Sequence, residues 1–341
     1  MRFFDHQDAA RSATRRLLLG FALAVLLVVP SVHGALMLAW LLMSAFISLV
    51  LPVSLSYPTG FLAVNVGLSL LFILGGWWLE TSQLRAGGVR LAERVGAREA
   101  RPGVSHAEQR FCNVLDELCI AGGVARPQPV VLARTEAINA FAAGWDEDDA
   151  VIAVTQGALD HLSREELQGM VAHELSHLHE GDTRLKMQLA GMVYGLELVY
   201  NFGDELRERG GLGTLFGSAI MVAGLAGWLA GRVLKAAVSR QREYLADARA
   251  VQWTRSRDGL GGVLRKVMTQ TQTLGTEGRS HTGLSHPAVQ HMLLVDLTGD
   301  GALAGWLTSH PTLAQRVRRI YGRAMGPLPL NTQQALVDPY L

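Results

Sequence analysis

Charged side chains are scarce in this chain of 341 residues: they make up 18% of it, whereas hydrophobic residues make up 49%. Soluble globular domains carry about a quarter charged residues, so the deficit indicates segments buried in a membrane. Charge of one sign is also not in excess, since the formal net charge is +1. A nucleic-acid-binding protein neutralises phosphates with a clear surplus of Lys and Arg, and this composition argues against that class.

Cysteine is nearly absent, with only Cys112 and Cys119 in the chain. On a helix over residues 105–121 the two would share a face but lie two turns apart, at about 10 Å. A disulfide needs Cα atoms within about 7 Å of each other. The spacing therefore excludes a disulfide framework, and a reducing compartment is the simpler interpretation.

Two long apolar tracts lie near the amino terminus, and residues 17–80 are assigned to a transmembrane anchor. Residues 17–53 and 60–79 each reach the roughly 20 residues that a helix needs to cross the hydrocarbon. Arginines are concentrated before the first tract, in a basic segment of residues 1–16, and again in residues 85–101. Basic flanks favour the cytoplasmic side, which predicts two spans between them. The first tract is also long enough to cross twice, which would make three.

Two further apolar stretches lie within residues 186–235. Residues 215–233 are rich in Gly and Ala, which suits close packing between membrane helices. Residues 187–202 are less apolar and fit a span or a buried soluble helix equally well. We therefore expect one or two membrane-associated helices here. If both cross, they form a hairpin that returns Glu243 to the side on which His173 lies.

Outside these tracts, hydrophobic periodicity predicts a mainly helical fold with a small β-sheet. Apolar side chains recur at helical spacing over residues 105–120, and residues 129–133 and 150–155 are predicted to be short strands. Ser163, followed three residues later by Glu166, is typical of a capping box, which opens a helix.

That helix carries the sequence His-Glu-Leu-Ser-His over residues 173–177. His173 and His177 lie one turn apart on the same face, so two imidazole nitrogens can bind one cation. Glu174 lies beside that face, where its carboxylate can take a proton from a water activated by the metal. It would then return the proton to the leaving amine, the role of a general base and acid. The motif thus predicts a catalytic metal centre.

A catalytic zinc site needs three protein ligands and one open position. The metzincin extension would place Gly at 180 and His at 183, but this chain has Glu180 and Thr183, which excludes that class. A distant carboxylate is the other standard solution. Glu243 is the candidate ligand, and Asp247, four residues on, can accept a hydrogen bond from a ligand His and fix its tautomer.

The motifs His173-Glu-Leu-Ser-His177-Leu-His-Glu-Gly-Asp182 and Ser239-Arg-Gln-Arg-Glu243-Tyr-Leu-Ala-Asp247 resemble those of the HtpX-like membrane metallopeptidases, relatives of the CAAX prenyl endopeptidases. The resemblance covers most of the chain from about residue 80 onward. It implies a gluzincin-type zinc metallopeptidase domain, here residues 81–341, combined with transmembrane helices. It also implies one Zn²⁺ per chain, bound by His173, His177 and Glu243, with Glu174 catalytic.

Two further elements resemble parts of the same family. Asn139, Ala140, Phe141 and Ala142 are similar to its strand before the active helix, and their free edge could pair with the backbone of a peptide substrate. An ordinary packed strand fits these residues as well. His310 could donate a hydrogen bond to the oxyanion, with Arg316 nearby. A structural role for His310 is equally compatible, and His286 is a rival.

These features together predict a membrane-bound zinc metalloendopeptidase that hydrolyses membrane or misfolded proteins in protein quality control. We expect it to be a multi-pass protein of a bacterial inner membrane, with its active site facing the cytoplasm. Its expected partners are peptide substrates and membrane lipid, with no nucleic acid. A prenyl-protein processing protease is an alternative. A catalytically silent membrane scaffold or adaptor is an alternative of another class.

Overall fold

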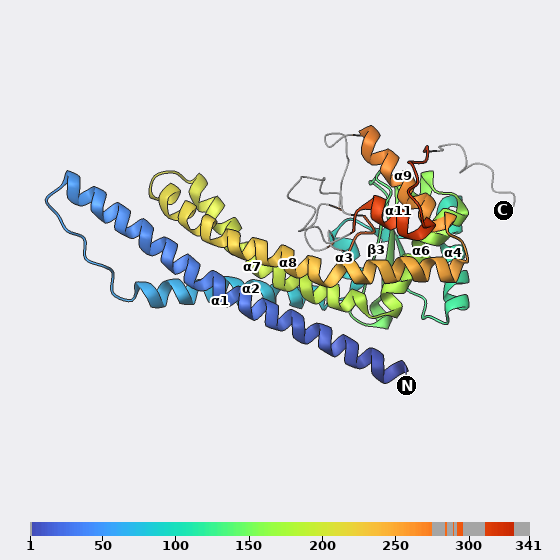
Figure 1. The fold of residues 1–341 in the computed structure, drawn as a ribbon, viewed down its shortest axis with the longest axis horizontal. Coiled ribbons are helices and arrows are strands. Elements are labelled where there is room, and N and C mark those ends of the chain that lie inside the picture. The colour runs from blue at the N-terminus through green and yellow to red at the C-terminus, as the bar shows by residue number, and fades with distance from the viewer. Residues whose placement is uncertain (1, 275–283, 285–288, 290–291, 296–310, 331–341) are drawn as a thin grey trace. The chain divides into compact units, whose positions relative to one another are not determined.

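The computed structural model describes residues 2–274, 284, 289, 292–295 and 311–330. It is mainly helical with a small mixed sheet, which confirms the predicted fold class (Figure 1). In chain order the elements are α1 (Arg2–Val50), α2 (Phe61–Leu84), α3 (Gly88–Arg94), β1 (Arg98–Glu99), α4 (His106–Gly122), β2 (Gln128–Leu132), β3 (Ala140–Ala143), the 3-10 turn η1 (Glu147–Asp149), β4 (Val151–Thr155), α5 (Gln156–His161), α6 (Arg164–His179), α7 (Asp182–Glu208), α8 (Leu212–Thr254), α9 (Asp258–Leu274) and α11 (Leu313–Tyr321).

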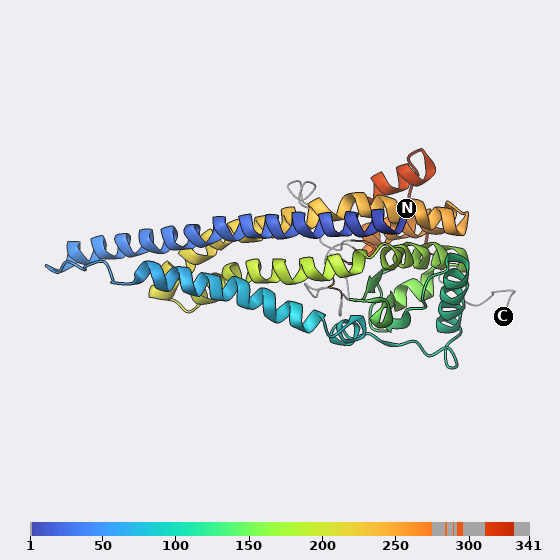
Figure 2. The ribbon, with the colours of Figure 1, turned by 90° about the horizontal axis from the view of Figure 1, so that it is seen from below.

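The chain divides into two compact units, which we call the helical unit and the sheet unit. The helical unit comprises Met1–Ser82 and Gln188–Lys235, and the sheet unit comprises Gln83–Met187 and Ala236–Leu341. Within the helical unit, α1, α2, most of α7 and the first half of α8 run alongside one another (Figures 1 and 2).

Three helices of the described chain are long and apolar enough to cross a membrane, namely residues 15–50, 61–84 and 212–235. Large apolar side chains on them point outward: Leu26 is 70% exposed and Leu71 66%. Side chains of this kind suit contact with lipid. The first apolar tract forms one helix that continues through Pro30 to Val50, so it does not fold back to cross twice.

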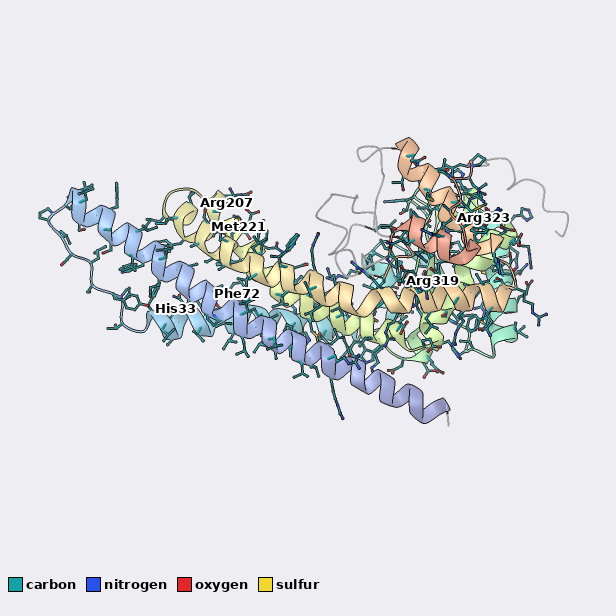
Figure 3. All side chains as sticks on the ribbon, in the orientation of Figure 1. His33, Phe72, Arg207, Met221, Arg319 and Arg323 are labelled. Atoms are coloured by element: carbon teal, nitrogen blue, oxygen red, sulfur yellow. The ribbon has the colours of Figure 1, made fainter. Side chains whose placement is uncertain are left out.

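Helix α7 is more polar than these three, and it packs closely against two of them. Glycines allow the approach, because a Cβ at Gly195 would collide with the backbone of Ile73 in α2 and one at Gly203 with the backbone of Met221 in α8. Figure 3 shows Met221 near the turn between α7 and α8. An ion pair also joins α7 to α8, with Lys235 Nζ 3.6 Å from Glu197 Oε1. Helix α7 is thus an internal helix of this unit, which accounts for its weak hydropathy.

The sheet has the strand order β1-β2-β4-β3. Strands β2 and β4 are parallel, with Val130 opposite Ala153, and the outer strands β1 and β3 are antiparallel to their neighbours. All of β3 and β4 is buried. Helix α6 contacts β3 and β4 and also packs against α4 and α9, so it lies in the centre of the core.

The ends of α4 and α6 follow their sequence signals. The predicted helix over 105–120 is confirmed as α4, which begins after Ser105 and ends at Gly123 with a φ of 62°. The predicted capping box is confirmed as well, since Ser163 and Glu166 bond reciprocally at the start of α6. The Glu166 carboxylate also accepts a hydrogen bond from Lys266 Nζ of α9 at 2.7 Å. These contacts fix the first turn of α6, two turns before His173.

Candidate active site

Helix α6 presents His173 and His177 one turn apart in the core of the sheet unit. Their side chains are 0% and 2% exposed, and the two ring planes are perpendicular, with centroids 4.9 Å apart. A buried polar atom without a partner is costly, so the ring nitrogens of these two imidazoles need polar groups around them.

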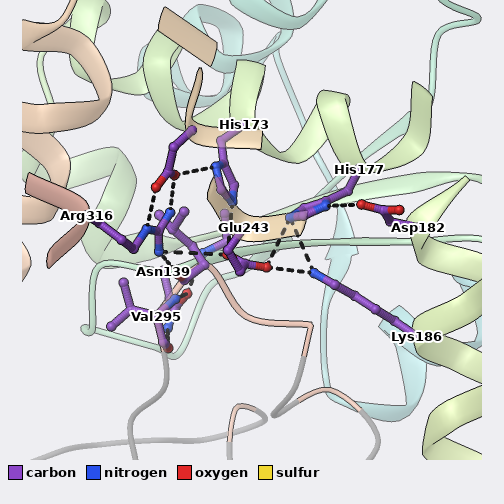
Figure 4. Close-up of polar contacts among 11 residues, drawn as sticks. Asn139, His173, His177, Asp182, Lys186, Glu243, Val295 and Arg316 are labelled. Atoms are coloured by element: carbon purple, nitrogen blue, oxygen red, sulfur yellow. Dashed lines mark hydrogen bonds and ion pairs between the residues drawn. The ribbon is translucent and has the colours of Figure 1, made fainter. Parts of the chain in front are cut away.

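Glu243 of α8 completes a group of three on these rings (Figure 4). Its Oε2 lies 3.5 Å from His173 Nε2 and its Oε1 lies 3.3 Å from His177 Nε2. One ligand atom from each of the three residues lies within 4.8 Å of the others. Zinc bonds of about 2.0–2.1 Å in tetrahedral geometry place neighbouring ligand atoms about 3.3–3.4 Å apart. The two separations, each to a different oxygen of Glu243, are close to this spacing.

Each imidazole is oriented from behind by a carboxylate. His173 Nδ1 lies 3.0 Å from Asp247 Oδ1, and His177 Nδ1 lies 3.0 Å from Asp182 Oδ2. A carboxylate accepts, so both Nδ1 atoms carry the proton and both Nε2 lone pairs face Glu243. This arrangement raises the basicity of a metal-binding imidazole and fixes its orientation.

The two carboxylates are in turn held by arginines. Arg242 forms an ion pair with Asp182. Arg316 of α11 donates to both oxygens of Asp247, from Nε at 2.9 Å and from Nη2 at 2.6 Å. Arg316 also donates from Nη1 to the Leu294 carbonyl at 2.6 Å. The arginines thus neutralise acids that would otherwise be buried without a counter-charge.

Asp247 and Arg316 shift each other's protonation. Burial by itself would raise the pKa of Asp247, but the charge of Arg316 and the hydrogen bonds from His173 and Arg316 outweigh it, and the pKa lies below its usual value. Burial would likewise lower the pKa of Arg316, but the charge and hydrogen bonds of Asp247 raise it above its usual value. Both groups are therefore ionised at neutral pH, and Asp247 stays an acceptor for His173.

Glu174 is a candidate general base rather than a candidate metal ligand. It is 1% exposed, and neither carboxylate oxygen has a hydrogen-bond partner among the described residues. Buried carboxylates without a partner are rare and call for an explanation. A carboxylate next to His173 in sequence and free to accept protons fits the role of accepting one from a reacting water.

Sequence reasoning missed two residues of this site, Asp182 and Lys186. Lys186 Nζ lies 3.2 Å from Glu243 Oε1 and 3.3 Å from His177 Nε2, and the residue is 4% exposed. Helix α6 ends before the left-handed Gly181, with a φ of 70°, and α7 starts at Asp182. This turn brings back residues that helical spacing would separate from His177. The Gly181-Asp182 pair soon after the motif was the only sequence signal of this turn.

The proposed substrate residues lie where β3 forms one edge of the sheet. Ala140, Phe141 and Ala142 belong to β3, and Asn139 directly precedes it. All four are buried, and the Ala140 carbonyl accepts a hydrogen bond from Leu294 N at 2.9 Å. The Asn139 side chain bonds to both backbone groups of Val295, at 2.9 and 3.3 Å (Figure 4). Part of this edge is therefore already paired within the chain.

The oxyanion candidate His310 and its rival His286 lie outside the described residues. Arg316, expected near the oxyanion, is buried against Asp247, and its Nη1 lies 3.9 Å from Glu243 Oε2.

Residues 105–324 match the model of Peptidase family M48. The curated relatives include a protease HtpX homolog of Dictyoglomus turgidum, 34% identical over 223 residues, covering 63% of this chain and 68% of the relative. The HtpX homolog of Dictyoglomus thermophilum is 36% identical over 223 residues with the same coverage. Protease HtpX of Legionella pneumophila is 31% identical over 220 residues, covering 62% of this chain and 75% of that protein. No solved structure matches the chain.

Proposed function

This chain belongs to peptidase family M48, as an HtpX-like membrane metalloprotease, and we propose that it is a zinc-dependent endopeptidase with its zinc bound by His173, His177 and Glu243. The observation that carries the proposal is the convergence of these three buried side chains, with ligand atoms within 4.8 Å of one another. Their separations are close to those of zinc ligands, and the carboxylate beside each Nδ1 favours the tautomer that a ligand needs.

The chemistry follows from the groups around that site. When bound, zinc lowers the pKa of a water towards about 7 and polarises the scissile carbonyl. The Glu174 carboxylate takes the proton of the attacking water and then delivers it to the leaving amine. Asp247 and Asp182 keep His173 and His177 in orientation throughout, because their own positions are fixed by Arg316 and Arg242.

The substrate in this proposal is an extended stretch of a membrane or misfolded protein. Successive residues of an edge strand direct their backbone groups to alternate sides. Ala140 bonds to Leu294 on the side away from β4, so Ala142 faces the same way. The bridge between Phe141 and Leu293 places residues 292–294 along this side, so we place the substrate backbone at β3 in exchange for that segment. Main-chain pairing of this kind tolerates many sequences, which suits a quality-control protease.

Removing the metal tests the proposal directly. Purified protein should contain one zinc per chain, and stripping it with a chelator should abolish casein cleavage until Zn²⁺ is restored, because Glu174 needs a water whose pKa the metal has lowered. Elemental analysis and a casein assay on the same sample measure both. A stripped protein that cleaves at the untreated rate would overturn the zinc mechanism. A zinc-loaded protein without peptidase activity would favour the alternative that the chain is a catalytically silent membrane scaffold.

We further propose that the chain crosses the membrane four times, at α1, α2, α7 and α8. Residues 212–235 have the length and composition of a span, and Glu243 beyond them meets His173, which precedes α7. A chain that crosses on α8 and returns to the side of His173 must also cross on α7. With four crossings, the basic segment 1–16 lies on the same side of the membrane as the active site of the peptidase domain, residues 81–341. Basic flanks favour the cytoplasm, so we place the active site in the cytoplasm of a bacterium and the anchor, residues 17–80, in the inner membrane.

Cysteine labelling tests the fourth crossing. Arg209 lies in the turn between α7 and α8 and its side chain is 70% exposed. In a background with Cys112 and Cys119 replaced by Ala, we expect Arg209→Cys to react with an impermeant maleimide on intact spheroplasts. The control Glu117→Cys, on the exposed face of α4, should react only after lysis. Protection of Arg209→Cys until lysis would show that this turn stays on the cytoplasmic side.

A further inference from the structure

Lys186 contacts two of the three proposed zinc ligands through the atoms that the metal would use. Its ammonium lies 3.3 Å from His177 Nε2 and 3.2 Å from Glu243 Oε1. The Nδ1 atom of His177 faces Asp182, so the Nε2 atom bears the lone pair and Lys186 is the donor. We propose that Lys186 competes with zinc for His177 and Glu243 and so weakens the metal affinity of this site. This inference rests on the proposed function.

The competition has two physical causes. A lone pair that accepts a hydrogen bond from Lys186 is not available to a metal, so zinc must displace the ammonium from His177 Nε2. The ammonium is also a positive charge beside a divalent cation in a poorly solvated place, where charges are weakly screened. Since Lys186 is 4% exposed, it cannot turn into solvent without movement of the packing around it. Both effects lower affinity.

Lys186 also supplies a counter-charge to the buried Glu243. Glu243 is 0% exposed, and an ionised carboxylate that deep in a protein is stable only when paired. Arg316 lies further away, at 3.9 Å, and its strongest hydrogen bonds go to Asp247 and the Leu294 carbonyl. Lys186 is thus the nearer cation and stabilises the site when zinc is not bound. Its loss should therefore have opposite effects on stability and on zinc affinity.

A supporting role predicts the reverse sign. If Lys186 stayed on one oxygen of Glu243 while the other oxygen bound zinc, it would orient the ligand and strengthen binding, as hydrogen-bond donors to metal-bound carboxylates do. The sign of the affinity change on removing the lysine separates the two roles.

The experiment is a zinc competition titration of full-length protein in detergent against a chromogenic chelator. For Lys186→Met we expect the zinc Kd to fall by about tenfold, because the competing donor and its positive charge are both removed. We expect the metal-free protein to melt at a lower temperature and zinc to raise its melting temperature by more than in the parent. Lys186→Gln, which keeps a donor but loses the charge, should also tighten binding and serves if the Met variant does not fold.

The matched control is Lys266→Met. Lys266 is 4% exposed and pairs with Glu166 at 2.7 Å, so this change also removes a buried Lys–Glu pair, but away from the site. It should lower the melting temperature and leave the zinc Kd unchanged. An unchanged or weaker affinity in both Lys186 variants overturns the competition while leaving the proposed function intact. A parent protein that binds no zinc overturns the proposed function and this inference with it.

Discussion

Replacing Glu174 by Gln is expected to abolish peptide hydrolysis while the protein keeps its zinc. The amide has nearly the same shape as the carboxylate but cannot take a proton from water. General acid–base groups contribute about 10²–10⁴ in rate, so cleavage should fall by at least about a hundredfold. Because Glu174 is not among the three converging ligands, zinc content should not change. A casein assay and elemental analysis of the same preparation measure both quantities.

Glu165→Gln is the matched control for this prediction. Glu165 lies on the same helix, is exposed, and its carboxylate bonds only to Ser256 among the residues the structure describes. It should retain parental activity. Parental hydrolysis by Glu174→Gln would end the assigned mechanism, and loss of zinc from it would make Glu174 a ligand. A silent but zinc-loaded variant can also reveal substrates, because intact proteins that accumulate in its membranes are candidates.

Replacing Arg316 by Met is expected to give the largest loss of stability in the sheet unit. Arg316 is 1% exposed and is the bidentate partner of Asp247, which is 3% exposed. Breaking a buried pair by removing one partner costs about 3–5 kcal/mol, since the other charge stays buried without compensation. Asp247 would no longer be held against His173, so zinc affinity should also fall, by about 10- to 100-fold. Thermal melting and zinc titration measure the two effects.

Two comparisons make the Arg316 prediction specific. Arg318→Met removes an exposed arginine from the same helix and should leave melting and zinc binding near parental values. The double variant Arg316→Met with Asp247→Asn removes both charges, which is milder than leaving one, and should recover part of the lost stability. If Arg316→Met melts like the parent, the Asp247 pair does not support the site.

Much of the fold was predictable because its signals are local. The capping box at Ser163 acts within one turn of helix and lies where the sequence predicts it, and the helix predicted over residues 105–120 is α4. Apolar tracts are also local in composition, although α7 was ambiguous. Glycines let α7 approach α2 and α8 closely, so it can be an internal helix although it is less apolar than they are. A hydropathy profile does not detect such packing.

The sequence by itself determined the residue types of the chemistry and the spacing of His173, Glu174 and His177, because one turn of helix sets that geometry. It identified Glu243 and Asp247 through a motif, but only the tertiary structure decided that α8 brings them to α6. The same holds for Lys186 at the ligands and Arg316 at Asp247. The physical reason is that the role of a charged side chain depends on its burial and on the distance to its partners. Both are set only when segments far apart in the chain pack into one core.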